Sequence, residues 1–163
     1  MRFIVLGHTG FVGKNLMKYL VNEGHSVVAI SRKECDFRDF KSLKRALQSC
    51  GSVDAIFNCA ANVGSVHYVT KYAADVISDN VMMSLNLYNC VKEMVNPPII
   101  LNPFSNCCYA NGTDIQKEEN WLKGEVHPSV FSFGNFKRTL YYISKCYKAQ
   151  HDIRSINLMF SGI

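Results

Sequence analysis

A glycine-rich turn between a short apolar run and an amphipathic stretch constrains the fold of this chain more than any other feature. The apolar run covers residues 3–6, the turn reads Gly7-x-x-Gly10-x-x-Gly13, and the amphipathic pattern covers residues 11–23. This order predicts a β-strand, a tight turn and an α-helix. Gly7 permits the turn, Gly10 lets the backbone approach a pyrophosphate, and Gly13 lets the helix pack closely on the strand.

The N-terminus of this helix is a candidate site for phosphates, because its unpaired N–H groups and the helix dipole favour negative charge. A glycine triplet alone is weak evidence. Its position at the first strand-to-helix turn favours dinucleotide binding over a purely structural turn. The residues expected to hold the dinucleotide here are Gly7, Thr9, Gly10, Phe11, Val12 and Gly13.

The composition is typical of a globular domain. With 163 residues, of which 48% are hydrophobic and 19% charged, the chain is long enough for one core, and we expect residues 1–163 to form a single domain. The net charge of +5 is modest and the basic residues are scattered, which does not favour a nucleic-acid polymer as a partner. No apolar stretch approaches the length of a signal peptide or a membrane-spanning helix, so we expect a cytoplasmic protein that binds no membrane.

The cysteine pattern does not indicate a metal site. The seven cysteines, at positions 35, 50, 59, 90, 107, 108 and 146, include no C-x-x-C pair and no spacing suited to zinc. We interpret them as reduced thiols.

The second expected strand indicates which dinucleotide the chain prefers. Residues 26–30 form a continuous β-favouring run, followed directly by Ser31, Arg32 and Lys33. In dinucleotide-binding folds this position meets the adenosine ribose, where a carboxylate binds a 2′-hydroxyl and an arginine accommodates a 2′-phosphate. We therefore expect Arg32 to favour NADP (NADPH), with NAD as the less favoured cofactor; the alternative is a solvated surface charge.

The third expected strand also ends at the ligand-binding edge of the expected sheet. A helical pattern starts at Asp39, and a third buried strand over residues 53–59 runs into small residues at its carboxyl end, where open α/β sheets bind ligands. Small side chains there leave room for a ribose or nicotinamide, although they also suit a closely packed turn. Cys59, Ala60 and Ala61 are therefore expected to line the cofactor site.

The remaining chain continues the alternation of strands and helices. Its expected elements are helices over residues 67–95, in two pieces, and 133–150, strands over 99–101 and 155–160, and a polar loop over 111–128. Asn80 and Asn86 lie within the first of these helical patterns, where we expect them to brace a neighbouring loop. The order β-α-β-α-β-α-β-α-β predicts a doubly wound parallel sheet with helices on both faces.

Several of these features together resemble the extended short-chain dehydrogenase/reductase family, in order and spacing, over essentially the whole chain. The matching stretches are Gly7-x-x-Gly10-x-x-Gly13, Asp36-Phe37, Asn58-Cys-Ala-Ala61, Asn80 with Asn86, Ser105 four residues ahead of Tyr109, and Lys137. The resemblance implies a Rossmann-like α/β fold, an NAD(P) cofactor and a nucleotide-sugar substrate. It also implies that Asp36 and Phe37 belong to the cofactor-binding residues. Within the family it is closest to the enzymes that epimerise and reduce GDP-4-keto-sugars.

One position departs from the family pattern. The family's Tyr-x-x-x-Lys falls on residues 133–137, so the catalytic tyrosine is replaced by Phe133. The resemblance implies that Ser105 binds the substrate oxygen and that Lys137 holds the cofactor ribose. Phenylalanine has no proton to exchange, and general acid–base assistance is typically worth about 10²–10⁴-fold, so we expect the ordinary mechanism to be impaired or replaced.

Cys107 matches a cysteine that serves as a second acid/base in the resembling enzymes. Its alternative role is that of a small buried residue beside Cys108. The partner histidine of such a cysteine, and the family's C-terminal substrate domain, would lie beyond Ile163 and are absent from this sequence.

Three functions are therefore compatible with the sequence. The chain is an NADP(H)-dependent nucleotide-sugar reductase, epimerase or dehydratase, a dinucleotide-binding or sensor module that has lost turnover, or the N-terminal fragment of a longer enzyme. The long helices expected at residues 76–95 and 133–150 are those through which the resembling proteins pair, so a homodimer is a further expectation.

Overall fold

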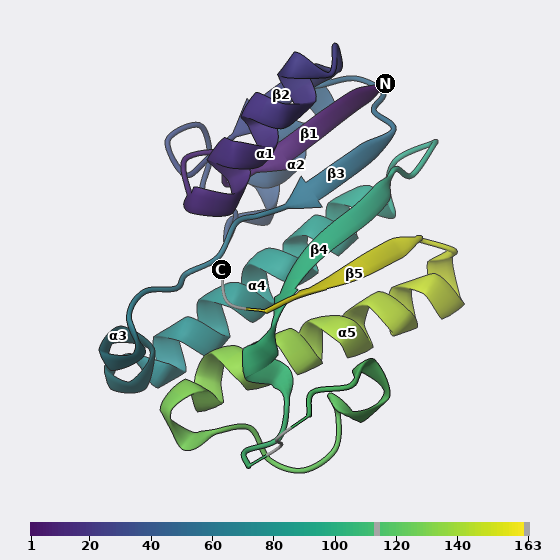
Figure 1. Ribbon diagram of the computed structural model, residues 1–163. Coiled ribbons are helices and arrows are strands. Elements are labelled where there is room, and N and C mark those ends of the chain that lie inside the picture. Colours follow the sequence, from purple (N-terminus) through teal and green to yellow (C-terminus); the bar gives the residue numbers. More distant parts are fainter. Residues whose placement is uncertain (113–114, 162–163) are drawn as a thin grey trace.

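The computed structural model describes residues 1–112 and 115–161, which form one five-stranded parallel sheet flanked by helices (Figure 1). The strands are β1 (Arg2–Leu6), β2 (Ser26–Ile30), β3 (Ala55–Asn58), β4 (Ile99–Ser105) and β5 (Ser155–Phe160). The α-helices are α1 (Phe11–Asn22), α2 (Phe40–Ser49), α3 (Val66–Lys71), α4 (Ala73–Val91) and α5 (Phe131–His151). Short 3₁₀ turns cover Asn106–Cys108, Glu118–Asn120 and Pro128–Val130.

The strand order is β2-β1-β3-β4-β5, and every neighbouring pair is parallel. Leu6, the last residue of β1, pairs with Ile30 on one side and with Asn58 on the other. These are also the last residues of β2 and β3. The loops that follow the three strands therefore leave the sheet at one edge, which is where open parallel sheets bind ligands.

Helices pack on both faces of the sheet, as the alternation of elements predicts. Side chains alternate along a strand, so Ile4 of β1 joins the core formed with α2, α4 and α5, while Phe3 and Val5 pack with Leu20 of α1 on the opposite face. In Figure 1 the helices α4 and α5 lie behind β4 and β5, and α1 lies in front of β1 and β2. This arrangement is the doubly wound α/β fold.

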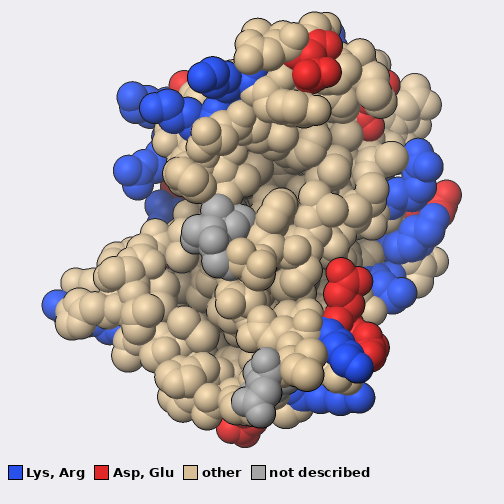
Figure 2. Space-filling view, in the orientation of Figure 1, with Lys and Arg blue, Asp and Glu red and all other residues tan. Residues whose placement is uncertain are grey.

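The α1 face of the sheet is covered unevenly. Ile156, Leu158 and Phe160 of β5 are 47%, 38% and 36% exposed. Their strand neighbours Ser155 and Asn157 point to the other side, where they hydrogen-bond to side chains of α4 and α5. Figure 2 shows the middle of this face largely free of charged side chains, with Lys and Arg in separate groups around the rim. Within the described residues, the outer half of the α1 face is therefore an exposed apolar surface.

Most boundaries follow local sequence signals. Asp39 caps α2, its carboxylate accepting hydrogen bonds from the N–H groups of Lys41 and Ser42. The strands at residues 26–30 and 155–160 have the expected bounds, and the helical pattern at 67–95 divides into α3 and α4. The third strand is shorter than the expected 53–59, and α5 begins two residues before the expected Phe133, directly after the turn at Pro128–Val130.

β4 is longer than the expected 99–101, because tertiary contacts satisfy a buried polar residue within it. The Asn102 side chain is fully buried; its Nδ2 donates to the Tyr88 hydroxyl and to Asn157 Oδ1, both at 3.0 Å, and its Oδ1 accepts from Asn58 Nδ2 at 3.1 Å. Pairing with β5 then continues to Ser105, which lies opposite Phe160.

The polar loop at 111–128 is anchored to α5, although its residues 113–114 lie outside the described part of the chain, as do residues 162–163. The Arg138 guanidinium donates to the carbonyl oxygens of Cys108, Trp121 and Gly124, at 2.8, 3.0 and 2.6 Å. The Trp121 indole packs edge-on against the rings of Phe104 and Tyr141. The end of β4 is thereby held against α5.

Candidate dinucleotide-binding site

A cavity of about 770 Å³ lies at the carboxyl ends of β1, β2 and β3. Its lining residues are Gly7, Thr9 and Gly10 from the first turn, Ser31, Arg32 and residues 36–38 after β2, residues 59–63 after β3, and Tyr68, Asp79 and Met83 from α3 and α4. A smaller cavity of about 320 Å³, between α2 and the C-terminal end of α4, contains none of the expected site residues. The larger cavity is therefore the candidate site.

The glycine turn has the geometry that a phosphate cradle requires. Gly7 has a φ of +78°, and its N–H donates to the Ile30 carbonyl at 2.7 Å. A Cβ at Gly7 would lie 2.7 Å from the Ala60 backbone, and a Cβ at Gly13 only 2.4 Å from the Gly7 carbonyl oxygen. A Cβ at Gly10 would meet nothing nearer than 3.5 Å. Close packing of the backbone thus requires glycine at positions 7 and 13. At Gly10 the absence of a side chain leaves space that a ligand can occupy.

The N-terminus of α1 presents amides to this space. The Gly10 N-cap contributes no side-chain hydrogen bond, and the first helical bond runs from the Lys14 N–H to the Gly10 carbonyl. The amides of Phe11, Val12 and Gly13 precede that bond, as expected for an anion site. Among the described residues, the only buried side-chain nitrogen or oxygen without a hydrogen-bond partner is Nδ1 of His8, in the same turn. The residues present thus suit a bound pyrophosphate.

The turn after β2 holds Arg32 at the cavity. Ser31 is buried, and both its N–H and its hydroxyl donate to the Glu34 carboxylate, at 2.6 and 2.7 Å. These two hydrogen bonds hold the pKa of Glu34 below its ordinary value. No motif in the sequence indicates that Glu34 belongs to the site. Its role is to fix the turn so that the exposed Arg32 side chain follows directly at the cavity wall.

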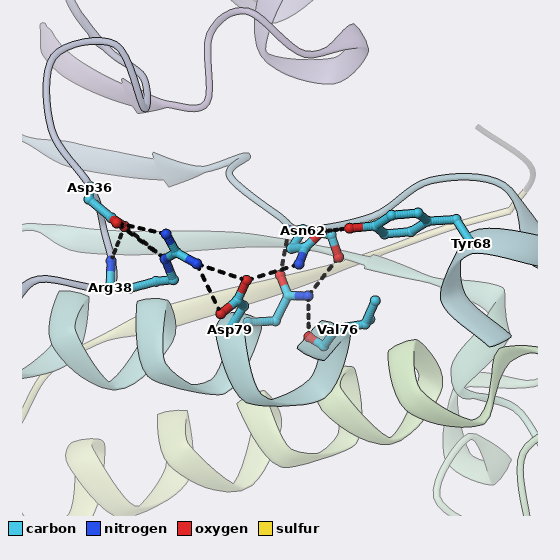
Figure 3. Close-up of polar contacts among 7 residues, drawn as sticks. Asp36, Arg38, Asn62, Tyr68, Val76 and Asp79 are labelled. Atoms are coloured by element: carbon cyan, nitrogen blue, oxygen red, sulfur yellow. Dashed lines mark hydrogen bonds and ion pairs between the residues drawn. The ribbon is translucent and has the colours of Figure 1, made fainter. Parts of the chain in front are cut away.

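An ion-pair network that the sequence did not indicate crosses the cavity wall (Figure 3). The Arg38 guanidinium donates from Nε and Nη2 to the Asp36 carboxylate, at 3.0 and 2.8 Å, and from Nη1 to both oxygens of Asp79 at 3.3 Å. These hydrogen bonds lower the pKa of Asp36 and raise that of Arg38. Arg38 and Asp79 are 41 residues apart, so no local pattern could have paired them.

The loop after β3 is fixed by the same network. Asp79 accepts a hydrogen bond from Asn62 Nδ2 at 3.0 Å, and the Tyr68 hydroxyl donates to Asn62 Oδ1 at 2.9 Å (Figure 3). Asn80 binds both the N–H and the carbonyl of Asn62, at 2.8 Å each. Asn86 donates to the carbonyls of Phe37 and Arg38, at 3.0 and 2.8 Å. The expectation that these two asparagines of α4 brace neighbouring loops is confirmed.

The residues expected to act at the reactive end lie in a second cluster, at the end of β4 and the start of α5. Ser105, Cys107, Phe133 and Lys137 are not among the residues that line the cavity. Lys137 is only 7% exposed; its Nζ donates to the Pro103 carbonyl at 2.7 Å and lies 5.0 to 5.7 Å from the ring centroids of Phe136, Phe133 and Phe104. Burial lowers the pKa of Lys137 to about 8.

Cys107 is the acidic thiol of this cluster. The neighbouring Cys108 thiol, the nearby Ser105 hydroxyl and the charge of Lys137 lower the pKa of Cys107 below its ordinary value, although burial opposes the shift. Helix α5 approaches this turn closely because residue 134 is glycine: a Cβ there would lie 2.4 Å from the Cys107 carbonyl oxygen. By contrast, burial raises the pKa of Cys59 to about 11.

The described residues hold no group of three His, Cys, Asp or Glu side chains arranged for a metal ion. The seven cysteines are free thiols. Of the helices in residues 1–112 and 115–161, none combines the length and apolar character needed to span a membrane.

Comparison with known proteins agrees with this arrangement. GDP-L-fucose synthase from Dictyostelium discoideum is 23% identical over 164 residues, a match that covers 98% of this chain and 51% of that protein. Two solved structures share the fold. MlghC, the GDP-mannoheptose C4 reductase of Campylobacter jejuni with NADP bound, superposes with a TM-score of 0.87 at 21% identity, over 99% of this chain and 51% of that one. The GDP-L-fucose synthetase of Naegleria fowleri bound to NADP superposes with a TM-score of 0.87 at 20% identity, over 99% of this chain and 50% of that one.

This chain thus spans about half the length of the relatives that it matches. The sequence pattern of one family extends over residues 3–163, which include both the cavity and the Lys137 cluster. The chain belongs to the NAD dependent epimerase/dehydratase family.

Proposed function

We propose that this chain binds NADP(H) and forms the cofactor-binding part of a nucleotide-sugar epimerase, reductase or dehydratase. The observation that carries the proposal is the 770 Å³ cavity, bounded by the glycine turn, Arg32 and the small residues after β3. The family is NAD-dependent, and two structural neighbours, MlghC and the Naegleria fowleri GDP-L-fucose synthetase, have NADP bound.

Different residues of the cavity would bind three different parts of the expected cofactor. The amides at the start of α1 would take the pyrophosphate, and Arg32 would pair with a 2′-phosphate through its guanidinium. Ala60 and Ala61 would leave room for the nicotinamide half. When bound, the nicotinamide supplies hydride transfer, and Lys137 and Ser105 would orient the ribose and a substrate oxygen.

A fluorescence titration with NADPH and NADH tests the cofactor part of this proposal. We expect NADPH to bind more tightly, and Arg32→Ala to weaken NADPH about tenfold or more while changing NADH little. Lys33→Ala is the matched control, because Lys33 is also an exposed cation but is not part of the cavity lining. Equal losses for both cofactors in Arg32→Ala would remove the argument for NADP.

The substrate part rests on the relatives, several of which are named for reactions on GDP-sugars. Oxidation of NADPH in the presence of a panel of nucleotide-4-keto-sugars, followed by absorbance, tests it. We expect a GDP-linked sugar to support the fastest oxidation.

A second candidate function is cofactor binding without turnover. The specific observation in its favour is that Phe133 places a ring without a hydroxyl beside Lys137 Nζ, at 5.3 Å. Tight NADPH binding, together with no turnover of any panel member, would favour this candidate.

A further inference from the structure

The wall of the candidate cofactor cavity contains two cations and two carboxylates, and three of the four are joined. Arg38 lies between Asp36 and Asp79 and donates hydrogen bonds to both (Figure 3). Within residues 1–112 and 115–161, Arg32 forms no ion pair with a carboxylate. The charges of the joined group sum to −1, and Arg32 brings the lining to neutrality.

We propose that Arg38 is a specificity-determining residue, which allows a 2′-phosphorylated dinucleotide to bind in the cavity. Its single positive charge offsets one of the two negative charges of Asp36 and Asp79, and its guanidinium forms hydrogen bonds with both carboxylates. The inference rests on the proposed function, because it concerns the same cofactor. A 2′-phosphate adds up to two negative charges to the ligand, and an unpaired carboxylate in the same cavity would repel it. A cofactor with a 2′-hydroxyl lacks that added charge and is affected less.

The geometry of Arg38 suits this role better than a structural one. The side chain of Arg38 is 51% exposed, that of Asp36 is 50% exposed and that of Asp79 is 28% exposed. Ion pairs with that much exposure contribute little to folding stability. A partly exposed charge still acts on a ligand that enters the same cavity, because the ligand displaces the water that screens it.

The loop that carries Arg38 has its own anchors. Asn86 of α4 donates to the carbonyls of Phe37 and Arg38, and the Arg38 N–H donates to Asp36 Oδ1 at 2.9 Å. None of these three hydrogen bonds uses the Arg38 guanidinium. Replacing that side chain therefore removes a charge from the cavity while the loop stays attached to α4.

The test compares the dissociation constants of NADPH and NADH in Arg38→Gln. Loss of the guanidinium leaves Asp36 and Asp79 without a counter-charge, so we expect NADPH to weaken about fivefold or more and NADH about twofold or less at low salt. The difference between the cofactors should shrink as the ionic strength rises. Arg45→Gln on α2 is the matched control, since it removes an exposed arginine away from the cavity.

A double variant separates charge from structure. Arg38→Gln with Asp79→Asn restores the original net charge of the lining, and an amide oxygen at residue 79 can still accept from Asn62. We expect this variant to regain most of the preference for NADPH. Failure to regain it, or an equal loss of both cofactors in Arg38→Gln, would overturn the proposal. If the unaltered chain binds neither dinucleotide, the proposed function fails together with this inference. If the chain prefers NADPH in a way that depends on Arg32, but Arg38→Gln leaves that preference unchanged, this inference alone is refuted.

Discussion

The Lys137 ammonium lies over the ring of Phe133, with Nζ 5.3 Å from the ring centroid, and its hydrogen bond goes to the Pro103 carbonyl. The neighbours of the Lys137 cation are therefore an aromatic ring and a carbonyl oxygen. A tyrosine at position 133 would add a hydroxyl group to these surroundings. Burial in these surroundings lowers the pKa of Lys137 to about 8, which makes the residue sensitive to pH and to substitution.

Lys137 should make the folding stability depend on pH. Between about pH 8 and pH 10.5 the unfolded chain keeps a proton that the folded chain releases, so the contribution of Lys137 to stability increases as the pH rises. We expect the unfolding free energy of the unaltered chain, relative to Lys137→Met, to increase by about 2 kcal/mol from pH 7.5 to pH 10. Urea denaturation under reducing conditions measures this, with Lys18→Met on the exposed side of α1 as the surface control. A difference that is independent of pH would contradict it.

Phe133→Tyr should restore a proton donor. The new phenol would lie beside the Lys137 ammonium, which lowers a phenol's pKa by favouring its charged form. If the chain turns over a nucleotide-4-keto-sugar, the rate of NADPH oxidation should increase about 10²–10⁴-fold. The control is Phe131→Tyr, at the exposed start of the same helix, and no increase in Phe133→Tyr would support the binding-module alternative.

Cys107 should react faster with alkylating agents than Cys59, although both thiols are half-buried. The pKa of Cys107 is lowered by its neighbours and that of Cys59 is raised by burial, so far more of Cys107 is thiolate near neutral pH. Allowing for the weaker nucleophilicity of the more acidic thiol, we expect Cys107 to react about tenfold or more faster than Cys59 with iodoacetamide at pH 7.5, measured by mass spectrometry of peptides. Ser105→Ala should slow the reaction of Cys107, because the nearby Ser105 hydroxyl favours the thiolate. Equal rates for the two thiols in the folded protein would refute the assignment.

Alanine at two positions of the glycine turn should separate folding from binding. Gly13→Ala places a Cβ 2.4 Å from the Gly7 carbonyl oxygen, so we expect a loss of more than about 2 kcal/mol of stability in urea denaturation. Gly10→Ala meets nothing nearer than 3.5 Å and should fold with at most a small change. Its methyl group would occupy the space expected for the pyrophosphate and should weaken NADPH about tenfold. Unchanged NADPH affinity in Gly10→Ala would place the phosphates elsewhere.

The glycine turn and the order of the elements could be predicted from the sequence because they depend on short-range constraints. Gly7 has a φ of +78°, which residues other than glycine rarely adopt. The sequence of β2 is a continuous β-favouring run, and the apolar residues of α2 follow the helix period. Asn80 and Asn86 could be identified as loop braces because a polar residue in the buried face of a helix needs a partner. The partners themselves, Asn62 for one and the Phe37–Arg38 backbone for the other, could not be identified in the same way.

The sequence by itself determined that strands and helices alternate around a glycine turn suited to phosphates, because backbone preferences and hydrophobic periods act over a few residues. Only the tertiary structure decided that Arg38 meets Asp79, that Asn102 is satisfied within β4, and that three rings surround Lys137. These pairings join residues far apart in the chain. Which of them meet depends on the order of the strands and the packing of α4 and α5 on the sheet, and no local pattern records that order.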